Sequence, residues 1–404
     1  METLRSPVAM ISYSWKDDAA AELLHDELTL RCFHVIHDRH TFADGSRVPT
    51  NMERGVADCD VFVAYLTPHS LYLDAPPDAA RPALEQELIP ALQRRRASLG
   101  SGEERPIVIP LSHGLGDRTA ASDKIRKLTG EHVNSLWSYW LDQDEARITQ
   151  PEAAEVASRC LHAFLSAQPL IPPVNLNVAT RGSSPMFDRL TIDGTRLFGE
   201  ERKPGFPEAW TRFVAALSSV ERQLKSVYGG GKIRVNLACH LSAAIATGRH
   251  FHQASGWSPE FATRHGFATP SPGKETAELM GALDRYGASG DLIVDIDLIG
   301  HDVADRASEL ARYLDAGGRL SLYRTGHADL SPQEISQLAR CVAERIRDGH
   351  AKLRPAVIHV ALSAPAAFAG LLGHHLSALQ ADIVSYELGS EGYVETVRVP
   401  CTAP

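Results

Sequence analysis

Several polar residues stand where strands of the sequence give way to helices, and their types suit phosphate recognition. Ser242 and Ser363 each open a predicted helix directly after an apolar strand. His240, His301 and Arg324 follow strands expected to end at the same sheet edge. Open α/β sheets bind ligands at that edge, where helix N-termini offer free N–H groups and a positive dipole end. The spacing predicts an anion site, although the serines could only cap helices and the other residues could serve loops or the core.

A second candidate site is a pair of carboxylates, Glu85 and Glu87, in the helical pattern of residues 84–95. At about 100° per residue the two glutamates flank an apolar stripe on opposite sides. The stripe consists of Leu84, Leu88, Ala91 and Leu92. Either glutamate could be an ordinary solvated helix residue, and periodicity does not choose between them.

The N-terminal part of the chain alternates strands with helices. Residues 60–66 form a near-continuous apolar run, which is typical of a strand buried on both faces of a parallel sheet. Repeated βα units of this kind predict an α/β fold with a doubly wound parallel sheet. The predicted strands are 8–13, 33–37, 60–66 and 106–111, and the predicted helices are 19–30, 51–57 and 84–95.

The alternation resumes after residues 166–185, which are rich in Pro, Gly and Ser and are predicted to be a linker between domains 1–165 and 186–404. Residues 235–244 and 358–367 look alike, because in each a strand runs into Ser-Ala at a helix start. Duplication of a Rossmann-like unit would produce this pattern, and so could chance. The predicted strands are 232–239, 291–298, 319–323, 356–362, 383–387 and 393–398; the predicted helices are 241–250, 302–315, 331–347 and 365–379.

Composition excludes several classes of protein. The 404 residues are 44% hydrophobic and 23% charged, as in ordinary globular proteins, and no run of about 18 apolar residues predicts a membrane span. The N-terminus has no apolar signal region, so we expect a cytoplasmic protein. Residues 1–168 carry 17 Lys and Arg against 25 Asp and Glu, a net charge of −8 in a total of −9. Long nucleic acid is therefore a poor partner, whereas a small cyclic nucleotide needs only a few donors.

Metal and disulfide sites are not expected. The six cysteines form no C-x-x-C pair, so neither a disulfide framework nor a zinc site is predicted. Of the eighteen histidines, the pairs His250/His252 and His374/His375 stand out, but no cysteine or carboxylate ligands accompany them at helical spacing.

Three segments of the N-terminal part resemble the TIR family. Residues 11–17 (Ile-Ser-Tyr-Ser-x-x-Asp) and 60–66 resemble its first motif and central strand, and residues 39–48 fall where TIR domains keep their BB loop. Residues 82–92 resemble the helix that carries the TIR glutamate. The resemblance covers roughly residues 5–145 and implies a flavodoxin-like parallel sheet.

The TIR resemblance implies cleavage of NAD+ at the nicotinamide–ribose bond, with NAD+ as substrate and no cofactor. It favours Glu87 over Glu85 as the catalytic carboxylate, which would stabilise an oxocarbenium-like transition state. Catalytic TIR domains often place Trp four residues before the glutamate, where this chain has Ala83. Stacking on NAD+ must then come from Trp15 or Phe42, which could equally be loop anchors. Ser14 and Asp38, each at the end of a predicted strand, complete the expected NAD+ site.

The C-terminal part resembles SAVED, a sensor domain of bacterial anti-phage (CBASS) systems built from two fused Rossmann-like, CARF-like units. The resemblance rests on residues 240–249, 357–373 and 383–387 and covers about residues 185–404. It implies binding of a cyclic oligoadenylate, with the cyclic tri-adenylate as the expected member, at His240, Ser242, His301, Arg324 and Ser363.

Together the resemblances predict an NAD+ glycohydrolase that acts in anti-phage defence, gated by a cyclic oligonucleotide and activated by assembly into multimers or filaments. The alternative is a non-catalytic TIR scaffold that the nucleotide assembles. The sequence leaves open the ring size, bases and linkages of the nucleotide, the linear or cyclised form of the product, and the geometry of assembly.

Overall fold

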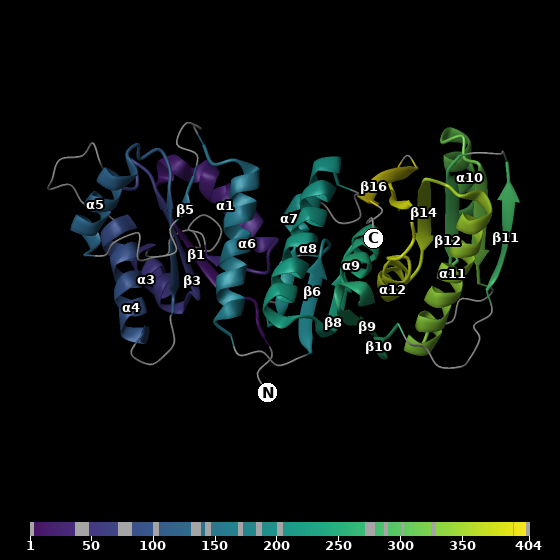
Figure 1. Ribbon diagram of the computed structural model, residues 1–404, viewed down its shortest axis with the longest axis horizontal. Helices are drawn as coiled ribbons and strands as arrows, with labels where there is room; N and C mark the ends of the chain where they lie inside the picture. The colour runs from purple at the N-terminus through teal and green to yellow at the C-terminus, as the bar shows by residue number, and fades with distance from the viewer. Residues whose placement is uncertain are drawn as a thin grey trace. The chain divides into compact units, whose positions relative to one another are not determined.

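The computed structural model divides the chain into two compact units, Arg5–Leu170 and Ile171–Pro404, the second of which also takes in Met1–Leu4. Both units are shown in Figure 1. The residues that the structure describes are 4–36, 48–71, 83–99, 105–130, 139–141, 147–168, 173–182, 188–199, 205–270, 279–286, 290–300, 303–324, 329–390 and 392–400.

The first unit is built on a five-stranded parallel sheet in the order β2-β1-β3-β4-β5. Every residue of β3 is buried, as its uninterrupted apolar sequence predicts for a central parallel strand. This sheet confirms the α/β architecture expected of the N-terminal part. The strands are β1 (Val8–Ser12), β2 (His34–Ile36), β3 (Val61–Leu66), β4 (Ile107–Ser112) and β5 (Tyr139–Trp140).

Helices cover both faces of this sheet (Figure 1). Helices α1 and α6 pack together on one face, and α3, α4 and the π-helix η2 pack together on the other. The segment predicted as one helix over 84–95 instead begins as a π-helix and continues as α4. The helices are α1 (Asp18–Thr29), α3 (Val48–Asp58), η2 (Ala83–Leu88), α4 (Ile89–Leu99), α5 (Arg118–Thr129) and α6 (Gln150–Ser166), with the 3-10 turn η1 (Trp15–Asp17) before α1.

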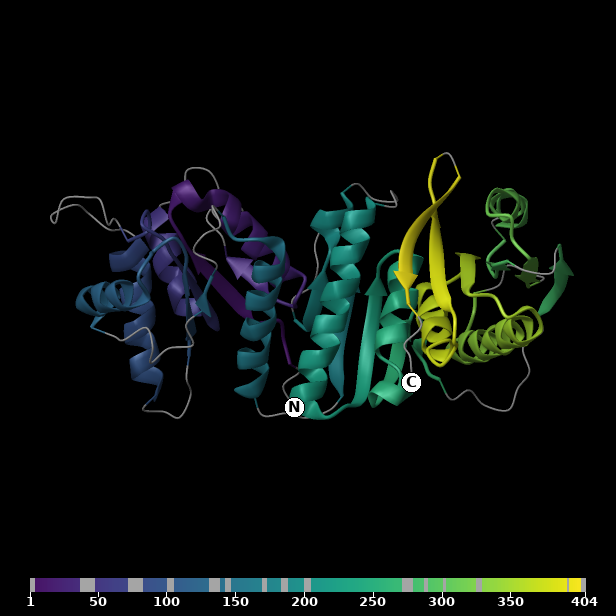
Figure 2. The same cartoon turned by 45° about the horizontal axis from the view of Figure 1, so that its top comes forward.

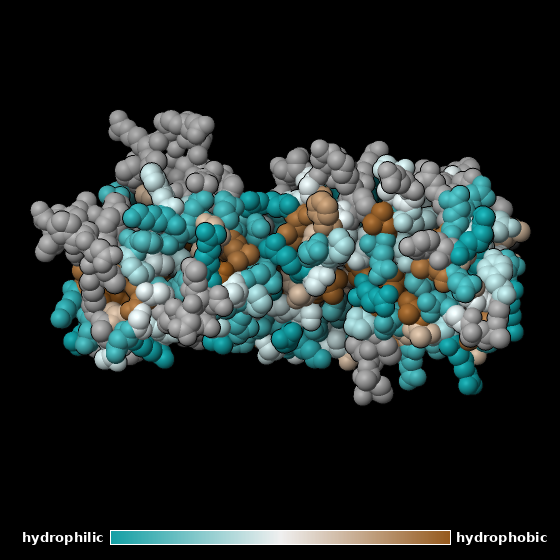
Figure 3. Space-filling model, turned by 90° about the horizontal axis from the view of Figure 1, so that it is seen from above, coloured by the Kyte–Doolittle hydropathy of each residue, from teal (hydrophilic) through white to brown (hydrophobic). Residues whose placement is uncertain are grey.

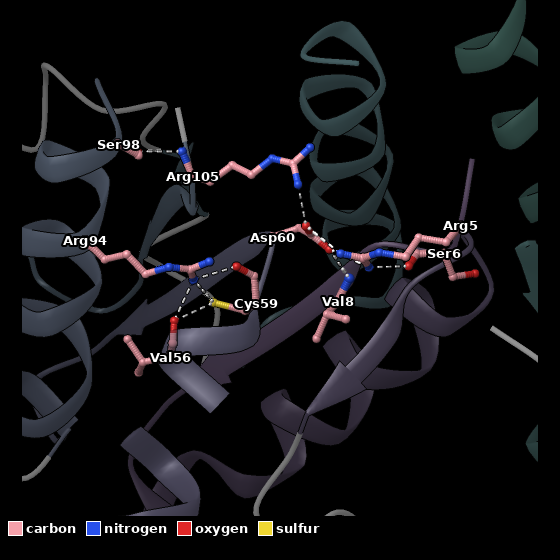
Figure 4. A network of polar contacts seen from close by, with 9 residues as sticks. All are labelled: Arg5, Ser6, Val8, Val56, Cys59, Asp60, Arg94, Ser98 and Arg105. Carbon is pink, nitrogen blue, oxygen red and sulfur yellow. Dashed lines mark hydrogen bonds and ion pairs between the residues drawn. The ribbon is translucent and has the colours of Figure 1, made fainter. Parts of the chain in front are cut away.

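Asp60 ties together the amino ends of three neighbouring strands (Figure 4). Its buried carboxylate accepts hydrogen bonds from the Val8 amide at 2.8 Å and from the guanidinium groups of Arg5 and Arg105 at 3.1 and 3.3 Å. Because Arg5 precedes β1 and Arg105 precedes β4, one carboxylate at the start of β3 fixes all three strand starts. Asp60 thus supports the sheet at the edge opposite the carboxyl ends of the strands.

The second unit contains two sheets. The first has five strands in the order β10-β9-β8-β6-β7, parallel except for the β9–β10 pair. Its elements are β6 (Val174–Ala179), β7 (Leu190–Asp193), α7 (Thr195–Phe198), α8 (Pro207–Tyr228), β8 (Gly231–Ala238), α9 (Leu241–His250), the 3-10 turn η4 (Gln253–Ser255), β9 (Trp257–Thr263) and β10 (Gly266–Ala268).

The other sheet has six strands in the order β11-β13-β12-β14-β15-β16, parallel at its centre and antiparallel at both edges. Its last two strands form the long hairpin drawn in yellow in Figure 2. The elements are β11 (Met280–Arg285), β12 (Leu292–Asp297), α10 (Val303–Tyr313), β13 (Gly318–Tyr323), α11 (Pro332–Leu353), β14 (Val357–Ser363), α12 (Ala366–His375), β15 (Asp382–Leu388) and β16 (Tyr393–Val399).

Helices α9 and α12 join the two sheets of this unit by packing against each other. A Cβ at Gly248 would lie 1.8 Å from the Gly370 carbonyl oxygen, and one at Gly373 would lie 2.1 Å from that of Ile245. Only glycine therefore permits this separation of the two helices. The helices follow β8 and β14, the two segments whose sequences look alike, so the unit contains two matching strand–helix pairs, as duplication predicts.

The prediction that residues 166–185 form a linker is wrong for part of this range, because it contains strand β6. Residues 174–179 form this strand, which pairs with both β7 and β8 inside the sheet. Strand β6 is hard to predict for two reasons. Proline-rich segments flank it, and Asn175 and Asn177 interrupt the apolar pattern that marks a buried strand. Asn177 is accommodated by a hydrogen bond from its Nδ2 to Thr191 Oγ1 at 3.2 Å.

Candidate active and ligand-binding sites

A pocket in the first unit lies at the carboxyl ends of β1 and β2, the edge at which open α/β sheets bind ligands. Its polar and aromatic lining comes from Tyr13, Trp15 and Glu87. The apolar lining comes from the strands and from α3, and consists of Met10, Ile11, Ile36 and Met52. A few polar groups over an apolar floor are typical of small-molecule sites.

Glu87 is the only acidic residue among the described residues that line this pocket. It is 3% exposed, although it lies on a surface helix, and the neighbouring Gln86 is exposed. The π-helix holds Glu87 in place because η2 contacts both α3 and β1, and Leu88 packs in the core beneath it. Isolated π-turns occur frequently at functional sites. The geometry brings Glu87 to the pocket, whereas the side chain of Glu85 lies outside the described residues.

The turn that carries Trp15 is fixed by two hydrogen bonds. Ser14 Oγ accepts from the Lys16 amide at 3.4 Å, which caps η1, and the Asp17 carboxylate accepts from Thr67 Oγ1 at 2.6 Å. The Asp17 carboxylate thus ties η1 to the end of β3, whereas the spacing of Ser14 and Asp17 alone suggests a local capping pair. Trp15 is 75% exposed, so one face of the pocket ends in an accessible indole ring.

Sequence reasoning missed Tyr13 as a pocket residue. It directly follows β1 and is buried, with its hydroxyl 3.5 Å from Asp18 Oδ1. The signal was available, since residues directly after a central parallel strand face the ligand edge. Asp38 and Phe42, the other two residues expected at an NAD+ site, lie outside the described residues, as does most of the loop 39–48.

In the second unit the structure commits His240 and Ser242 to internal contacts. His240 is buried, with its ring 5.3 Å from Phe198 and 5.6 Å from Trp210, and its Nδ1 lies 2.8 Å from Thr180 Oγ1. The Ser242 hydroxyl accepts from Thr396 Oγ1 at 2.7 Å. Both residues therefore have the buried, core surroundings that the sequence offered as one alternative to ligand contact, and neither side chain caps α9.

Ser363 differs from Ser242, although both stand near the start of a helix that follows a strand. Its residue is 8% exposed, and its hydroxyl has no hydrogen-bond partner among the described residues. The helix that follows, α12, begins at Ala366, and its N-cap residue Pro365 provides no side-chain cap. A buried hydroxyl without a partner is costly, so this end of β14 is suited to an added acceptor or donor.

Arg324 directly follows β13, and its guanidinium lies 3.7 Å from the Glu334 carboxylate. Its amide donates to the Asp297 carbonyl at 3.1 Å, which binds the ends of β13 and β12 together. His301 lies outside the described residues.

Exposed apolar side chains collect at the carboxyl edge of the six-stranded sheet. Tyr323 ends β13, Ile299 follows β12, and Leu388 ends β15. In the space-filling view from above, hydrophobic residues appear as separate small patches among hydrophilic ones (Figure 3). Apolar and aromatic surface beside an unpartnered hydroxyl can accept a flat base together with its phosphate.

Among the described residues, no group of three or more His, Cys, Asp or Glu side chains is arranged to hold a metal ion. Within the same part of the chain, every helix is too short or too polar to cross a lipid bilayer.

Comparisons with known proteins agree with this division into two units. The family model of the TIR domain matches residues 10–129, and that of the "SMODS-associated and fused to various effectors sensor domain", SAVED, matches residues 216–399. No curated protein matches the chain significantly.

Several solved structures align with this chain. The Acinetobacter baumannii Cap4 SAVED/CARF-domain receptor with the cyclic trinucleotide 2′3′3′-cAAA aligns with a TM-score of 0.50 and 12% identity, over 78% of this chain and 86% of that one. The same receptor with 3′3′3′-cAAA aligns at 0.48 and 14%, over 96% and 98%. The Moraxella osloensis Cap4 receptor aligns at 0.44 and 13%, over 95% and 98%. At such low identity the first alignment indicates a common fold.

Proposed function

We propose that this chain, which carries a TIR domain followed by a SAVED domain, is an NAD+ glycohydrolase that a cyclic oligonucleotide activates in anti-phage defence. The observation that carries the proposal is the buried carboxylate of Glu87 in the pocket that Tyr13 and Trp15 line. This pocket lies within the segment that the TIR model matches, and a sensor domain follows it in the same chain.

The proposed reaction needs little machinery. The bond between the nicotinamide nitrogen and ribose C1′ breaks, nicotinamide leaves with the bonding electron pair, and water adds to C1′. The products are nicotinamide, ADP-ribose and one proton. Glu87 stabilises the positive charge that develops on the ribose, because a carboxylate held in a site with little water interacts strongly with such charge. The exposed ring of Trp15 offers a stacking surface for one of the two bases of NAD+.

The direct test is NAD+ turnover by the full chain with cyclic tri-adenylate. Glu87→Gln should lower turnover by about 10²–10³-fold, as when one charge-stabilising group is removed, with nucleotide affinity within a few-fold of wild type. Gln86→Ala is the matched control, because Gln86 is exposed on the same π-helix. If Glu85→Gln is inactive and Glu87→Gln is active, Glu87 is not the catalytic residue. If both variants turn over normally, the carboxylate mechanism is wrong.

For the sensor we propose a cyclic oligoadenylate, with the tri-adenylate as the first ligand to test. Three observations support this choice: the unpartnered Ser363 hydroxyl, the uncapped start of α12, and the apolar side chains at the same sheet edge. A structural relative was solved with a cyclic tri-adenylate. Ser363→Ala should weaken binding by about tenfold, the loss expected for one hydrogen bond to a charged group. Unchanged affinity would mean that Ser363 only packs.

We further propose that the ligand activates the TIR domain by assembling several chains into multimers or filaments. Residues 1–168 carry a net charge of −8, so like domains repel until something holds them together. Light scattering with and without cyclic tri-adenylate tests this step. Chains that stay monomeric while they cleave NAD+ at the full rate would refute assembly. Chains that assemble but leave NAD+ intact would support the alternative, a non-catalytic scaffold.

A further inference from the structure

The two matching strand–helix pairs of the SAVED domain end differently. Each helix, α9 or α12, starts at the carboxyl end of a parallel strand, where its free N–H groups could hold a phosphate. Around the start of α12, the buried Ser363 hydroxyl has no partner. Around the start of α9, in contrast, the polar groups are already engaged by other parts of the same domain.

Glu387 is the group that engages the start of α9. Its Oε1 accepts a hydrogen bond from the Ser242 amide at 2.8 Å, although 145 positions separate the two residues in the sequence. Its Oε2 lies 3.4 Å from Nη2 of Arg181, the second residue after the end of β6. Glu387 belongs to β15 of the six-stranded sheet, whereas α9 and Arg181 belong to the five-stranded sheet. A carboxylate from one half therefore binds the helix start and the guanidinium of the other.

The contacts of Glu387 are those that a phosphate oxygen makes at a helix N-terminus: a backbone N–H donor and a guanidinium. Glu387 itself is 7% exposed, and its burial raises the pKa of the carboxyl group, while the Ser242 amide and Arg181 act in the opposite direction. Arg181 is not fully satisfied by this arrangement, since its Nε is buried without a hydrogen-bond partner among the described residues.

We infer that Glu387 is a specificity-determining residue, which fills with its own carboxylate the phosphate position at the α9 half of the sensor. A cyclic oligonucleotide then places a phosphate only at the α12 half, beside Ser363. This inference rests on the proposed nucleotide-sensing function. It explains why, of two similar strand–helix pairs, one leaves its helix start free for a phosphate and the other has its helix start bound by Glu387.

The charge of Glu387 can be tested separately from its packing. Glu387→Gln keeps an oxygen that can accept from the Ser242 amide, but it removes the negative charge and leaves Arg181 without an ionic partner. In calorimetric titrations of the full chain, this variant should bind cyclic tri-adenylate about tenfold more tightly than wild type, the gain of one charge-assisted hydrogen bond. Glu395→Gln is the matched control: it removes another carboxylate, paired with Arg398 on the neighbouring strand β16, and should leave affinity unchanged. Unchanged or weaker binding by Glu387→Gln overturns the inference.

Arg181→Gln gives a second measurement that does not depend on how Glu387→Gln folds. Because the guanidinium of Arg181 is already paired with Glu387, Arg181→Gln in the otherwise wild-type chain should change the affinity for cyclic tri-adenylate by less than about twofold. In the Glu387→Gln background the same change should cancel the gain, which a double-mutant cycle reports as coupling between the two residues. A loss of more than about tenfold in the wild-type background would mean that Arg181 binds the nucleotide directly, and the inference would be wrong.

Inorganic phosphate separates this inference from the proposed function. At constant ionic strength, replacing chloride by phosphate should raise the melting temperature of Glu387→Gln more than that of wild type, because both proteins keep the open α12 half but only the variant also opens the α9 half. If wild type fails to bind cyclic tri-adenylate while the variant shows this phosphate shift, the choice of ligand is wrong and the role of Glu387 stands. If phosphate stabilises both proteins equally, or neither, Glu387 does not close an anion position.

Discussion

Protonation of His250 should destabilise the SAVED domain in mildly acid solution. His250 ends α9, and its Nε2 is buried without a hydrogen-bond partner among the described residues. Burial, and to a lesser degree the neighbouring charges of His252 and Arg249, lower the pKa of His250 from 6.5 to about 4. A proton on this ring would place an unpartnered charged donor inside the domain, so the folded state excludes it.

The sign and size of the effect follow from proton linkage. Between pH 6.5 and 4 the unfolded chain binds a proton on His250 that the folded chain does not, so the free energy of unfolding falls as the pH falls. At pH 5 this one group should lower the free energy of unfolding by about 2 kcal/mol relative to pH 8. His375, at the end of α12, has a pKa lowered to about 4 by burial and by His374. It therefore adds a loss of stability over the same pH range.

Urea unfolding at pH 8 and pH 5 measures this difference, with the fluorescence of the buried Trp210 and Trp257 reporting on the SAVED domain. In His250→Gln the difference between the two pH values should shrink by about 2 kcal/mol, since glutamine does not titrate. His265→Gln, which changes an exposed histidine in a turn, should leave it unchanged. If His250→Gln retains the full pH dependence of wild type, the buried ring is not its source.

Three further predictions concern stability, each measured by urea unfolding of the domain concerned. Asp60→Ala should cost the TIR domain about 2–3 kcal/mol, because several donors lose one buried carboxylate. Gly373→Ala should cost the SAVED domain at least about 3 kcal/mol, since its Cβ would collide with the Ile245 backbone, whereas Gly349→Ala meets only flexible leucine ends and should be near neutral. Ser331→Ala should cost about 1 kcal/mol through loss of the capping box at α11.

The strands of the three sheets could be predicted where they are apolar and β-branched. Residues 60–66, 291–298 and 356–362 all become central parallel strands, since continuous apolar runs are buried on both faces. Strand β6 could not be predicted by the same rule, because its asparagines resemble loop residues until the partner strand supplies a hydrogen bond. Helix α8 was not predicted, although its buried residues recur at helical spacing in the sequence.

The candidate sites show a similar limit. Helical periodicity could distinguish Glu85 from Glu87 only if each residue turned the helix by about 100°. This segment is a π-helix, in which the turn per residue is different, so the α-helical pattern does not apply. The resemblance to TIR domains favoured Glu87, and the structure places Glu87 in the pocket. The contact between Glu387 and Ser242 could not be predicted, because it depends on how two sheets far apart in sequence pack together.

The packing of α9 against α12 bears on how a bound nucleotide could act at a distance. Backbone approaches that admit no Cβ at Gly248 or Gly373 leave the two helices no freedom to slide past each other without losing contact. Packed interfaces of this kind change between discrete arrangements and do not deform gradually. The ionic contact between Arg181 and Glu387 adds a second tie across the same two halves. If the proposed nucleotide binds at the carboxyl edge, it should therefore change the surface that this helix pair presents more readily than the packing within the pair. The proposed activation by assembly would act through that surface.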